Sequence, residues 1–540
     1  MIESNISVTQ LKGNMMNRLA FSIIVVIICA FPLLNAQVQL SGSVFHDKNK
    51  DGIHNSGEKG IKDIPVSNGR DIVLTDRKGF FHIVADSNDV VFIMQPSGWK
   101  VPVNDYNIPQ YYKNIRLKKG PDNLKYKGFT DPIPLPEKLA FPLYKSKNRG
   151  DKIRAIISGD PQPRDSAEVR YFRDEILNKM LTEKDAEFYI PLGDIMYDDL
   201  SLYPYYLEQV SRLGIPIWHI FGNHDINYRA PSDSLAKETW RTYFGPDYYS
   251  FEYGNVHFIA LNTVFYKGWN VEKNKKGSYL GKLHDNQTAW LENDLSLVSS
   301  DKQIVFLSHI PIISDVYKGK RVELTNRDQL YKMVHDRNKI LALSGHMHYL
   351  ENMELSADHG WTGEAEFRNL NLGAGCGAWW YGPIQANGVP YGFHYDGTPN
   401  GYFMFDFSKN NFNYEFIPSK SDPNQTFRIS SPSDRMTTAS MDTSILAVNV
   451  FFGGPKTIVS CTIDGNEIWL KKAVTAEDPY INRLIQLYPD LYPNVEDMPI
   501  NAHMWLGEFP TLSVGNHTIH VQVINDNGIT ENQAKIFEIY

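Results

Sequence analysis

Residues 188–198 read FYIPLGDIMYD, a short apolar run that ends in a glycine and then carries two aspartates. An uninterrupted apolar run of this length is typical of a buried β-strand. Four other apolar runs are followed in the same way by polar residues, at Gly159-Asp160-Pro161-Gln162, Gly222-Asn223-His224-Asp225, Ser308-His309 and Gly345-His346-Met347-His348. Because the carboxyl ends of parallel strands meet at one edge of a sheet, we expect the five polar clusters to converge there.

The apolar runs alternate with segments of helical character, which predicts an α/β fold with a buried sheet. The expected strands are Ile153–Ile157, Phe188–Leu192, Ile215–Ile220, Val256–Leu261, Ile304–Leu307 and Ile340–Leu343. The expected helices are Ala167–Leu181, Leu200–Leu213, Asp285–Ser299 and Asn326–Arg337. His219 lies inside one apolar run, so we interpret it as a structural residue.

The character of the chain changes on both sides of this α/β segment. We expect an N-terminal β domain at 37–118, a linker at 119–151, a catalytic domain at 152–366 and a C-terminal β-rich domain at 367–540. The linker is rich in proline and lysine. The C-terminal part ends in the alternating run Gly515–Ile524, which is typical of a sandwich domain.

Residues 1–36 have the features of an export signal. Lys12 and Arg18 precede the apolar run Leu19–Leu34, and a small residue, Ala36, stands before the predicted cut. A single membrane anchor is the alternative, but the run is short for a span and contains Pro32. We therefore expect export to the periplasm, the cell surface or the medium, and no stable membrane span in the mature chain.

Composition excludes several other classes of function. The formal net charge of the 540 residues is −8, and no block of like charges occurs, so no nucleic-acid binding is expected. The three cysteines, Cys29, Cys376 and Cys461, are too few and too scattered for a thiolate metal site. Whether Cys376 and Cys461 pair stays open.

The five polar clusters supply the donors of a metal site. Aspartate, asparagine and histidine suit divalent ions such as Mn, Fe or Zn better than a soft thiolate metal. A carboxylate can bridge two such ions, which together activate a water molecule and neutralise a phosphoryl oxygen.

In the order and spacing of these motifs the chain resembles the calcineurin-like metallophosphoesterases, and in particular a bacterial secreted subgroup with flanking β domains. The resemblance implies a β-sheet sandwich flanked by helices and a dinuclear site. Asp194 would bridge the two ions. The remaining ligands would be Asp160 and His348 at one ion, and Asn223, His309 and His346 at the other.

The resemblance also implies roles for the neighbours of these ligands. His224 would face the scissile phosphate as a general acid or a charge stabiliser, and Asp198 and Asp225 would orient the ligands or His224. Gln162 stands where the family pattern has histidine. Its amide oxygen is a weaker ligand than imidazole, which leaves the occupancy and identity of one ion open.

Two aromatic features have alternative interpretations. Tyr197 has the spacing of the iron-binding tyrosine of purple acid phosphatases, but it fits equally as a packing residue. The glycine-rich and aromatic stretches 373–382 and 396–402 would either form a wall of the substrate pocket or be tightly packed loops.

The N-terminal region contains a candidate calcium loop. Asp47, Asn49, Asp51 and Glu58 follow the pattern D-x-N-x-D-G-x₅-E, with Gly52 at the turn. The flanking segments are predicted strands, so the loop is closer to the calcium-stabilised β repeats of bacterial adhesins than to a helix–loop–helix motif. A polar hairpin loop is the alternative.

Together these features predict a secreted, metal-dependent hydrolase of phosphate esters that uses a hydroxide held by two metal ions. The substrate would be a phosphoester such as a nucleotide, a phospholipid or a phosphorylated glycan, and monoester and diester are not distinguished. The alternative is an exported binding or adhesion protein with a weak or inactive phosphoesterase scaffold.

Overall fold

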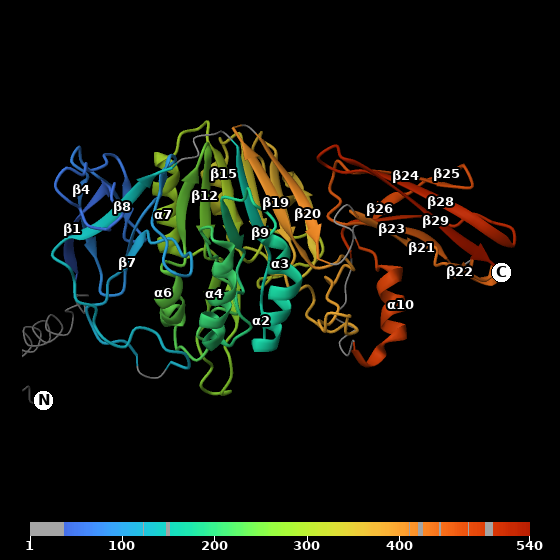
Figure 1. Ribbon diagram of the computed structural model, residues 1–540, viewed down its shortest axis with the longest axis horizontal. Helices are drawn as coiled ribbons and strands as arrows, with labels where there is room; N and C mark the ends of the chain where they lie inside the picture. Colours follow the sequence, from blue (N-terminus) through green and yellow to red (C-terminus); the bar gives the residue numbers. More distant parts are fainter. Residues whose placement is uncertain are drawn as a thin grey trace, which may run out of the picture.

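The computed structural model describes residues 37–121, 124–146, 152–409, 411–419, 425–441, 444–473, 475–491 and 501–540. The predicted signal segment, 1–36, therefore lies outside the described residues. A β region at each end flanks a central α/β region, and the three follow one another along the long axis of the molecule (Figure 1). Among the described helices none is long and apolar enough to cross a membrane.

The central region contains two β-sheets. One has six strands in the order β11-β12-β15-β16-β18-β17, and the other has four in the order β10-β9-β19-β20. Their bounds are β9 Ile153–Ser158, β10 Phe188–Pro191, β11 Tyr249–Tyr253, β12 Val256–Leu261, β15 Gln303–Ser308, β16 Ile340–Ser344, β17 Leu350–Glu354, β18 Phe367–Leu372, β19 Gly401–Ser408 and β20 Asn411–Pro418.

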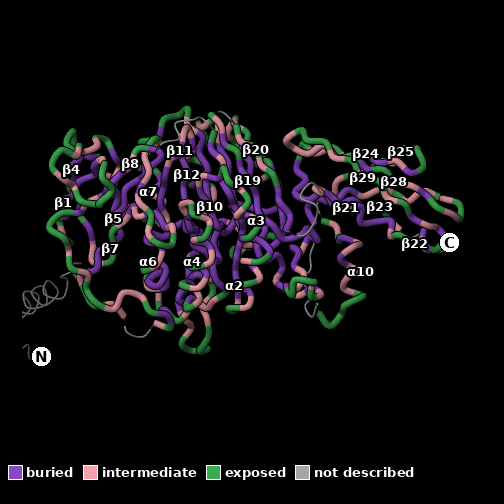
Figure 2. Tube along the Cα trace, viewed as in Figure 1, coloured by how far each residue is buried: buried purple, intermediate pink, exposed green. Residues whose placement is uncertain are grey.

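The inner strands are parallel and buried on both faces. β12 pairs with β15, β15 with β16 and β16 with β18, all in parallel register, and β9 pairs in parallel with β10. Every residue of β12 and β15 is buried, which explains their continuous apolar character (Figure 2). The predicted α/β fold is therefore confirmed, as a sheet sandwich with helices on its outside.

Helices occupy the segments in which the sequence predicts them. The first helical stretch runs through α2 Ser166–Phe172, η1 Arg173–Leu177 and α3 Asn178–Met180, and the second through η2 Leu200–Leu202, α4 Tyr203–Val210 and η3 Ser211–Leu213. The others are α5 Asp233–Ala236, α6 Glu238–Phe244, α7 Asp285–Leu297 and α8 Arg327–Val334. Asp165 caps α2 by accepting the backbone N–H groups of Ala167 and Glu168.

One predicted strand is wrong. Residues 215–220 form only an isolated bridge, Tyr189↔Ile217, beside β10. The segment follows β10 through backbone hydrogen bonds such as Tyr189 N–H to Pro216 O at 2.9 Å. Pro216 has no N–H to donate, so a regular ladder does not form. The segment still carries the polar cluster 222–225 to the end of β10, as an added strand would.

Two stretches differ from the expected division of the chain. The predicted linker, 119–151, contains β8 Leu139–Lys145, which pairs in parallel with β1 and buries Leu139, Phe141 and Leu143. The central sheets also continue past residue 366. β18 pairs with β16, and β19 pairs antiparallel with β9, so residues of the expected C-terminal domain complete both sheets.

The flanking regions are built from β-sheets of their own. The N-terminal sheets are β4-β1-β8-β6 and β3-β2-β5-β7, with β1 Val38–His46, β2 Pro65–Ser67, β3 Ile72–Leu74, β4 Phe80–Ala85, β5 Val90–Ile93, β6 Trp99–Lys100 and β7 Tyr112–Asn114. The C-terminal sheets are β21-β23-β27-β26 and β22-β29-β28-β24-β25. They comprise β21 Phe427–Ser431, β22 Arg435–Met436, β23 Ile445–Val450, β24 Ile458–Ile463, β25 Asn466–Ile468, β26 Lys471–Ala473, β27 Met504–Glu508, β28 Gly515–Ile524 and β29 Thr530–Ile539.

The smaller elements are a hairpin and short helices. The hairpin consists of β13 Val264–Tyr266 and β14 Tyr279–Gly281, and the helices are η4 Ala357–His359, α9 Thr438–Met441, α10 Pro479–Leu487 and η5 Pro489–Leu491. Cys376 and Cys461 are both free and buried. They lie in different regions of the chain and do not form a disulfide.

Candidate metal centre

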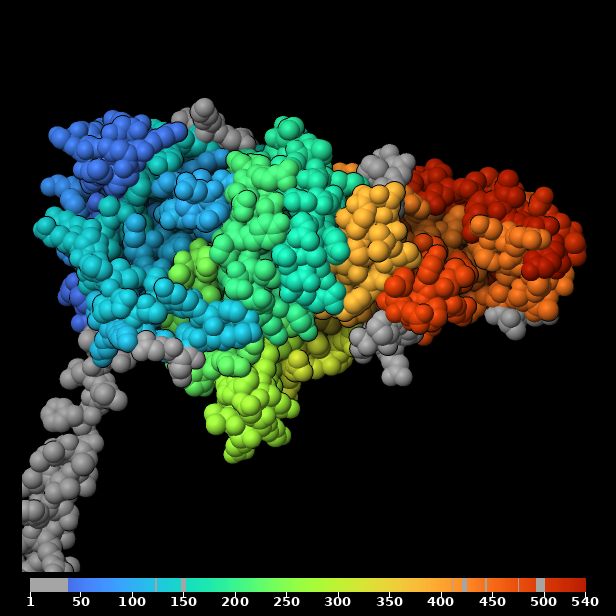
Figure 3. Space-filling model, turned by 60° about the horizontal axis from the view of Figure 1, so that its bottom comes forward, coloured from blue at the N-terminus to red at the C-terminus, as the bar shows by residue number. Residues whose placement is uncertain are grey.

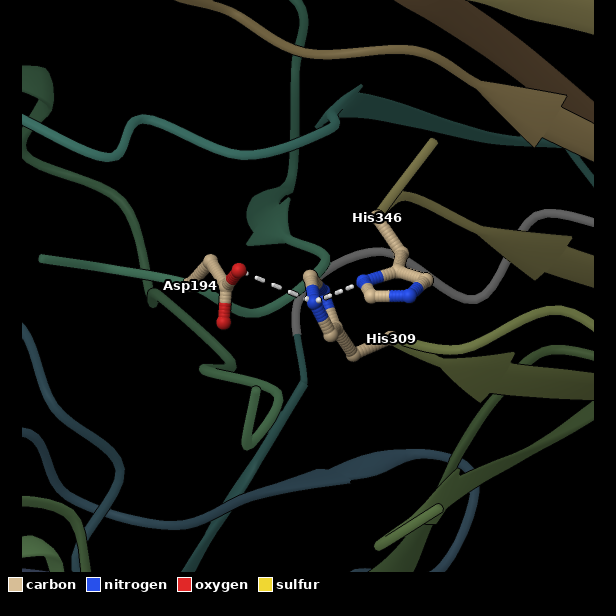
Figure 4. Close-up of side chains that lie close together, drawn as sticks. All are labelled: Asp194, His309 and His346. Carbon is tan, nitrogen blue, oxygen red and sulfur yellow. Dashed lines mark hydrogen bonds and ion pairs between the residues drawn. The ribbon is translucent and has the colours of Figure 1, made fainter. Parts of the chain in front are cut away.

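Three of the predicted ligands converge on one nitrogen atom, Nε2 of His309. Asp194 Oδ2 lies 3.1 Å from it, Asn223 Oδ1 lies 3.1 Å from it, and His346 Nδ1 lies 3.2 Å from it. Asp194, His309 and His346 each offer a ligand atom, and these atoms all lie within 4.8 Å of one another (Figure 4). The loops after β10, β15 and β16 therefore bring the donors for one cation together.

The second group of predicted ligands lies beside the first. His348 Nε2 is 3.3 Å from Asp160 Oδ2, and Asp160 Oδ1 is 3.8 Å from His309 Nδ1. Gln162 Nε2 donates a hydrogen bond of 2.9 Å to Asp194 Oδ2. Asp194 is thus placed between the two groups, where the sequence predicts a bridging carboxylate.

Each of the three histidines directs one ring nitrogen into the site and the other to a backbone carbonyl. His309 Nδ1 is 2.9 Å from Leu192 O, and His348 Nδ1 is 2.7 Å from Gly377 O. His346 Nε2 is 3.0 Å from Arg321 O. When the ring is neutral, a nitrogen that donates to a carbonyl leaves the opposite nitrogen unprotonated and free to bind a metal.

The donors fit divalent cations. Within the described residues, Gln162 Oε1 is a buried acceptor without a hydrogen-bond partner, and Asp160 Oδ2 faces His348 Nε2 at 3.3 Å. Buried polar atoms are nearly always satisfied, so the free oxygen of Gln162, beside a carboxylate and a cluster of imidazoles, fits a site that binds a cation. Asparagine, aspartate and imidazole are ligands that Mn, Fe and Zn share.

The charges of the site point in the same direction. Burial alone would lower the pKa of His309, but the carboxylates of Asp194 and Asp160 raise it to about 9. Burial and the charge of His309 lower the pKa of His346 to about 3. The carboxylates thus attract a positive charge to His309, and a bound cation would meet the same demand.

The backbone at this edge adopts an unfavourable conformation. Gln162, Asp194, His346 and His348 all have positive φ angles, of 37°, 46°, 76° and 53°. Non-glycine residues rarely adopt this left-handed region, and such strain is concentrated at functional sites. Sharp turns after the strands therefore direct these side chains back over the sheet edge.

Asp225 holds the Asp194 turn in place and does not contact the His224 ring. Its buried carboxylate accepts the backbone N–H of Ile195 at 3.0 Å, the N–H of Gly222 at 3.0 Å and the hydroxyl of Tyr203 at 2.9 Å. Burial and the charge of Asp194 raise the pKa of Asp225 to about 7. Asp225 is therefore a positioning residue for both loops.

His224 is oriented by Asp198. Its Nδ1 is 2.9 Å from Asp198 Oδ1, and its backbone N–H donates to Asp194 Oδ1 at 2.7 Å. Lys276 Nζ donates to the same oxygen of Asp198, and the Tyr126 hydroxyl donates to Asp198 O at 2.6 Å. Although burial raises the pKa of Asp198, its contacts with His224 and Lys276 lower it overall.

The aromatic loop after β18, residues 373–382, is tightly packed and also lies beside the site, so both interpretations that the sequence left open apply to it. Its glycines pack tightly against the metal site, since a Cβ on Gly159 would lie 1.8 Å from Gly373 O. Cys376 N–H donates to Asp160 O at 3.1 Å. Trp379 also lies beside the site, with its ring centroid 5.0 Å from that of His348. Tyr197 stacks on His224 at 4.5 Å.

The candidate calcium loop follows β1 and is closed by its own hydrogen bonds. Asp47 is buried, and its carboxylate accepts the N–H groups of Lys50 at 2.6 Å and Gly52 at 2.9 Å. Glu58 accepts the N–H of Lys48 at 2.7 Å. The four predicted oxygen donors are thus grouped around one loop, and this geometry also fits a polar loop without an ion.

Three family models match successive parts of the chain. Residues 47–129 match the N terminal of calcineurin-like phosphoesterase, 153–350 match calcineurin-like phosphoesterase, and 369–530 match the C terminal of calcineurin-like phosphoesterase. The chain belongs to the calcineurin-like phosphoesterase family. The order of the motifs and the convergence of their side chains in this calcineurin-like phosphoesterase agree with that assignment.

Curated relatives match a shorter stretch. The serine/threonine-protein phosphatase CPPED1 of Homo sapiens is 28% identical over 191 residues, which are 32% of this chain and 56% of that protein. The probable glycerophosphodiester phosphodiesterase GpdQ of Arcobacter nitrofigilis is 24% identical over 151 residues, 27% of this chain and 50% of that protein. The chain thus spans about half the length of these relatives.

A solved structure of purple acid phosphatase PPD1 from yellow lupin (Lupinus luteus) seeds overlaps with a TM-score of 0.37 at 13% identity. The overlap covers 71% of this chain and 70% of that chain.

Two residues at the site, Lys276 and Tyr126, escape sequence reasoning. Lys276 comes from the loop between β13 and β14, and Tyr126 comes from the stretch between the N-terminal and central regions. Neither stands in a motif or at a strand end, and each reaches Asp198 only through the fold. The one available signal is composition, since lysines cluster at 273–276 within a chain of net negative charge.

Proposed function

We propose that this chain hydrolyses phosphate esters with two divalent metal ions bound between the loops of the central sheets. The observation that carries the proposal is the convergence of Asp194, Asn223 and His346 on His309 Nε2, with the buried oxygens of Asp160 and Gln162 next to it. Asp194 would contact both ions. Asp160, Gln162 and His348 would complete one half of the site, and Asn223, His309 and His346 the other.

Two bound ions supply Lewis acidity, which lowers the pKa of water and neutralises a phosphoryl oxygen. The residues of the chain do the rest. Asp198 holds the Nδ1 side of His224, so Nε2 is the atom that would face the leaving oxygen and hand it a proton. Asp225 keeps the Asp194 and Gly222 turns at a fixed separation.

The test is turnover and metal analysis on the same sample. The purified chain loaded with Mn²⁺ should hydrolyse p-nitrophenyl phosphate or bis-p-nitrophenyl phosphate and retain about two ions per chain. Asp194→Asn should lose activity and most of its metal, because it removes the shared carboxylate. Asp328→Asn, on the exposed surface of α8, is the matched control. Absence of turnover together with absence of metal would favour the binding-protein alternative.

The identity of the metal and the class of substrate are two further proposals. Mn, Fe and Zn all suit the donor set. The amide of Gln162 points its nitrogen at Asp194, so we propose that the ion on the Asp160 side is held more loosely. A panel of nucleotides, a phospholipid headgroup ester and a phosphorylated sugar, assayed with each metal, would rank the substrate classes.

We also propose that the chain is exported and cut after Ala36. The charged residues Lys12 and Arg18 ahead of the apolar run and the small residue Ala36 at its end support this. Mass spectrometry of protein from expressing cells should find Gln37 at the N-terminus. A chain that keeps Lys12 in every cell fraction would contradict the proposal.

We further propose that residues 47–58 bind one calcium ion. Asp47, Asn49 and Asp51 present oxygens at alternate positions, and Gly52 makes the turn with a φ of 74°. Added Ca²⁺ should raise the melting temperature of the chain, and Asp51→Ala should abolish the shift. An equal response of the variant, or no response of either protein, would show a polar loop.

A further inference from the structure

A row of aromatic rings lies beside the candidate metal centre. Tyr197 stacks on His224 with ring centroids 4.5 Å apart and an angle of 26° between the planes. Trp379 meets Tyr197 edge-on, at 5.1 Å and 84°, and approaches His348 at 5.0 Å. The row therefore runs from His224 to the predicted metal ligand His348.

The position of Trp379 is fixed by the loop that carries it. Its φ angle is 71°, in the left-handed region that a bulky residue rarely occupies. Gly377, two residues earlier, offers its carbonyl oxygen to His348 Nδ1 at 2.7 Å. The loop is thus tied to the metal ligand itself, and a strained backbone in such a place is usually held for function.

An arginine fixes the ring from another side. The Arg164 guanidinium lies 5.4 Å from the centroid of Trp379 and 4.7 Å from that of Tyr381. Its Nε donates to Glu168 at 2.7 Å, so its charge is already paired within the chain. Arg164 therefore acts as a cation–π support for the ring, and a substrate phosphate would have to displace Glu168 to use it.

The two rings remain accessible. Tyr197 is 37% exposed and Trp379 is partly exposed, although the loop around them is largely buried. Because their planes are nearly perpendicular, they form a corner with one ring face and one ring edge. A flat ring that stacks on one of them presents its edge to the other, and stacked and edge-to-face contacts are the arrangements that aromatic groups prefer.

We propose that Tyr197 and Trp379 form a stacking corner for a planar ring in the leaving group, so that the preferred substrates are aryl or nucleoside phosphoesters. The inference rests on the proposed function, because it places the corner beside His224 and the metal ions. Aryl and nucleoside esters share the required chemistry, a planar aromatic group close to the scissile phosphate. Both residues would act on binding and orientation of the leaving group.

Binding of inert analogues tests the corner without turnover. Calorimetry on the metal-loaded full chain should show phenylphosphonate binding about tenfold more tightly than methylphosphonate, the increment expected from one aromatic contact. Trp379→Leu should remove this difference, and Trp379→Phe should restore most of it. Equal affinity of the two phosphonates for the wild-type chain, or an unchanged preference in Trp379→Leu, would overturn the proposal.

Kinetics then separate the sources of the ring and the two proposals. Phosphotyrosine, adenosine 5′-monophosphate and glycerol 3-phosphate are the substrates. Trp379→Leu should raise KM about tenfold for the two ring substrates and leave KM for glycerol 3-phosphate within about twofold. The ring substrate that loses more identifies the aryl or the nucleoside source. An equal loss on all three substrates contradicts the corner.

Two further results keep the outcomes distinct. Tyr197→Leu, whose ring contributes the other wall, should weaken phenylphosphonate selectively, and it serves as the second variant where Trp379→Leu fails to fold. A chain that prefers phenylphosphonate but turns over none of the substrates would contradict the proposed function and support the corner. A chain that turns over all substrates with equal KM would support the proposed function and contradict the corner.

Discussion

The two β regions that flank the central sheets contact them through different chemistry. The N-terminal region pairs Gln95 with Phe251 at the outer strand β11, and Ser97 N–H donates to Glu252 there at 3.2 Å. The C-terminal sheets reach the strand that follows His348 through the loop between β18 and β19, where the buried carboxylate of Asp396 accepts Leu350 N–H at 2.6 Å. Figure 3 shows the three regions side by side along the chain.

We call the Ser97–Glu252 contact the N-terminal joint and the contacts of Asp396 the C-terminal joint. The two joints differ in the residues that support them. Asp396 also accepts the N–H of Thr398 at 2.8 Å and contacts His503 Nε2 at 3.1 Å, so one carboxylate links the C-terminal sheets to the His348 segment. On the other side, the stretch that follows the N-terminal region contributes Tyr126, which donates to Asp198 O. We infer that the C-terminal region supports a metal ligand directly, whereas the N-terminal region supports the partner of His224.

Removal of the Asp396 carboxylate should have the largest effect. Asp396→Ala leaves the buried donors of Leu350 and Thr398 without an acceptor, which we expect to cost about 1–3 kcal/mol of stability for each donor. The His348 segment should then loosen, and metal analysis after dialysis should find less bound metal than in the wild-type chain. Thermal unfolding supplies the stability. Asp434→Ala, at a mostly exposed aspartate of the same region, is the control. Full metal content in a destabilised Asp396→Ala would contradict the direct link.

The N-terminal joint should weaken in alkali. Glu252 contacts His257 Nδ1 at 3.2 Å, and Asp294 contacts His257 Nε2 at 2.8 Å. Burial alone would lower the pKa of His257, but the two carboxylates outweigh burial and raise the pKa to about 9. Because the folded pKa exceeds the ordinary value of 6.5, protonated His257 stabilises the folded chain fully below pH 6.5, and this contribution is lost as pH rises through about 9. The difference corresponds to roughly 3 kcal/mol.

Denaturant unfolding at pH 6 and pH 10 measures this contribution. The wild-type midpoint should fall over that range, and His257→Gln should show a flatter dependence. His520→Gln, at an exposed position of β28, should keep the wild-type slope.

The C-terminal joint should respond in acid. Although burial raises the pKa of Asp396, His503 lowers it to about 2, so its contribution is present above about pH 4 and is lost as pH falls through about 2.

The smallest expected effect concerns Tyr126. Tyr126→Phe removes one hydrogen bond to the backbone of Asp198 and should cost about 1 kcal/mol of stability. Because Asp198 orients His224, kcat should fall by about fivefold while KM and metal content stay constant. Tyr106→Phe, at an exposed tyrosine of the same region, should leave all three unchanged. A loss of metal in Tyr126→Phe would contradict the inference that the N-terminal side supports only the partner of His224.

Sequence reasoning performs well where the signal is local. The polar clusters at Asp160, Asp194, Asn223, His309 and His346 follow apolar runs, and the sheet edge brings their side chains together. Even the segment that ends at Ile220 delivers its cluster correctly, although Pro216 prevents a regular strand. The chemistry of the donors and their order along the chain decide both the fold class and the family.

The parts that sequence reasoning misses depend on distant partners. Lys276 and Asp396 carry no motif, and each acquires its place through a contact with a residue far away in the chain, Asp198 and Leu350. The sequence does not predict the strand β8, because it lies in a proline-rich stretch and its run of buried residues is short. Such contacts are set by tertiary packing, which a single sequence does not display.

The pairing of β19 with β9 has a consequence for synthesis of the chain. β9 ends at Ser158, but its antiparallel neighbour begins only at Gly401. A ribosome needs about 10–50 s to make the stretch between them at ordinary rates. During that time one side of β9 has backbone groups without their native partner, which is the kind of edge that recruits other strands. We expect the nascent central region to depend on chaperones until residue 408 has emerged, and a chain that stops at 366 to aggregate.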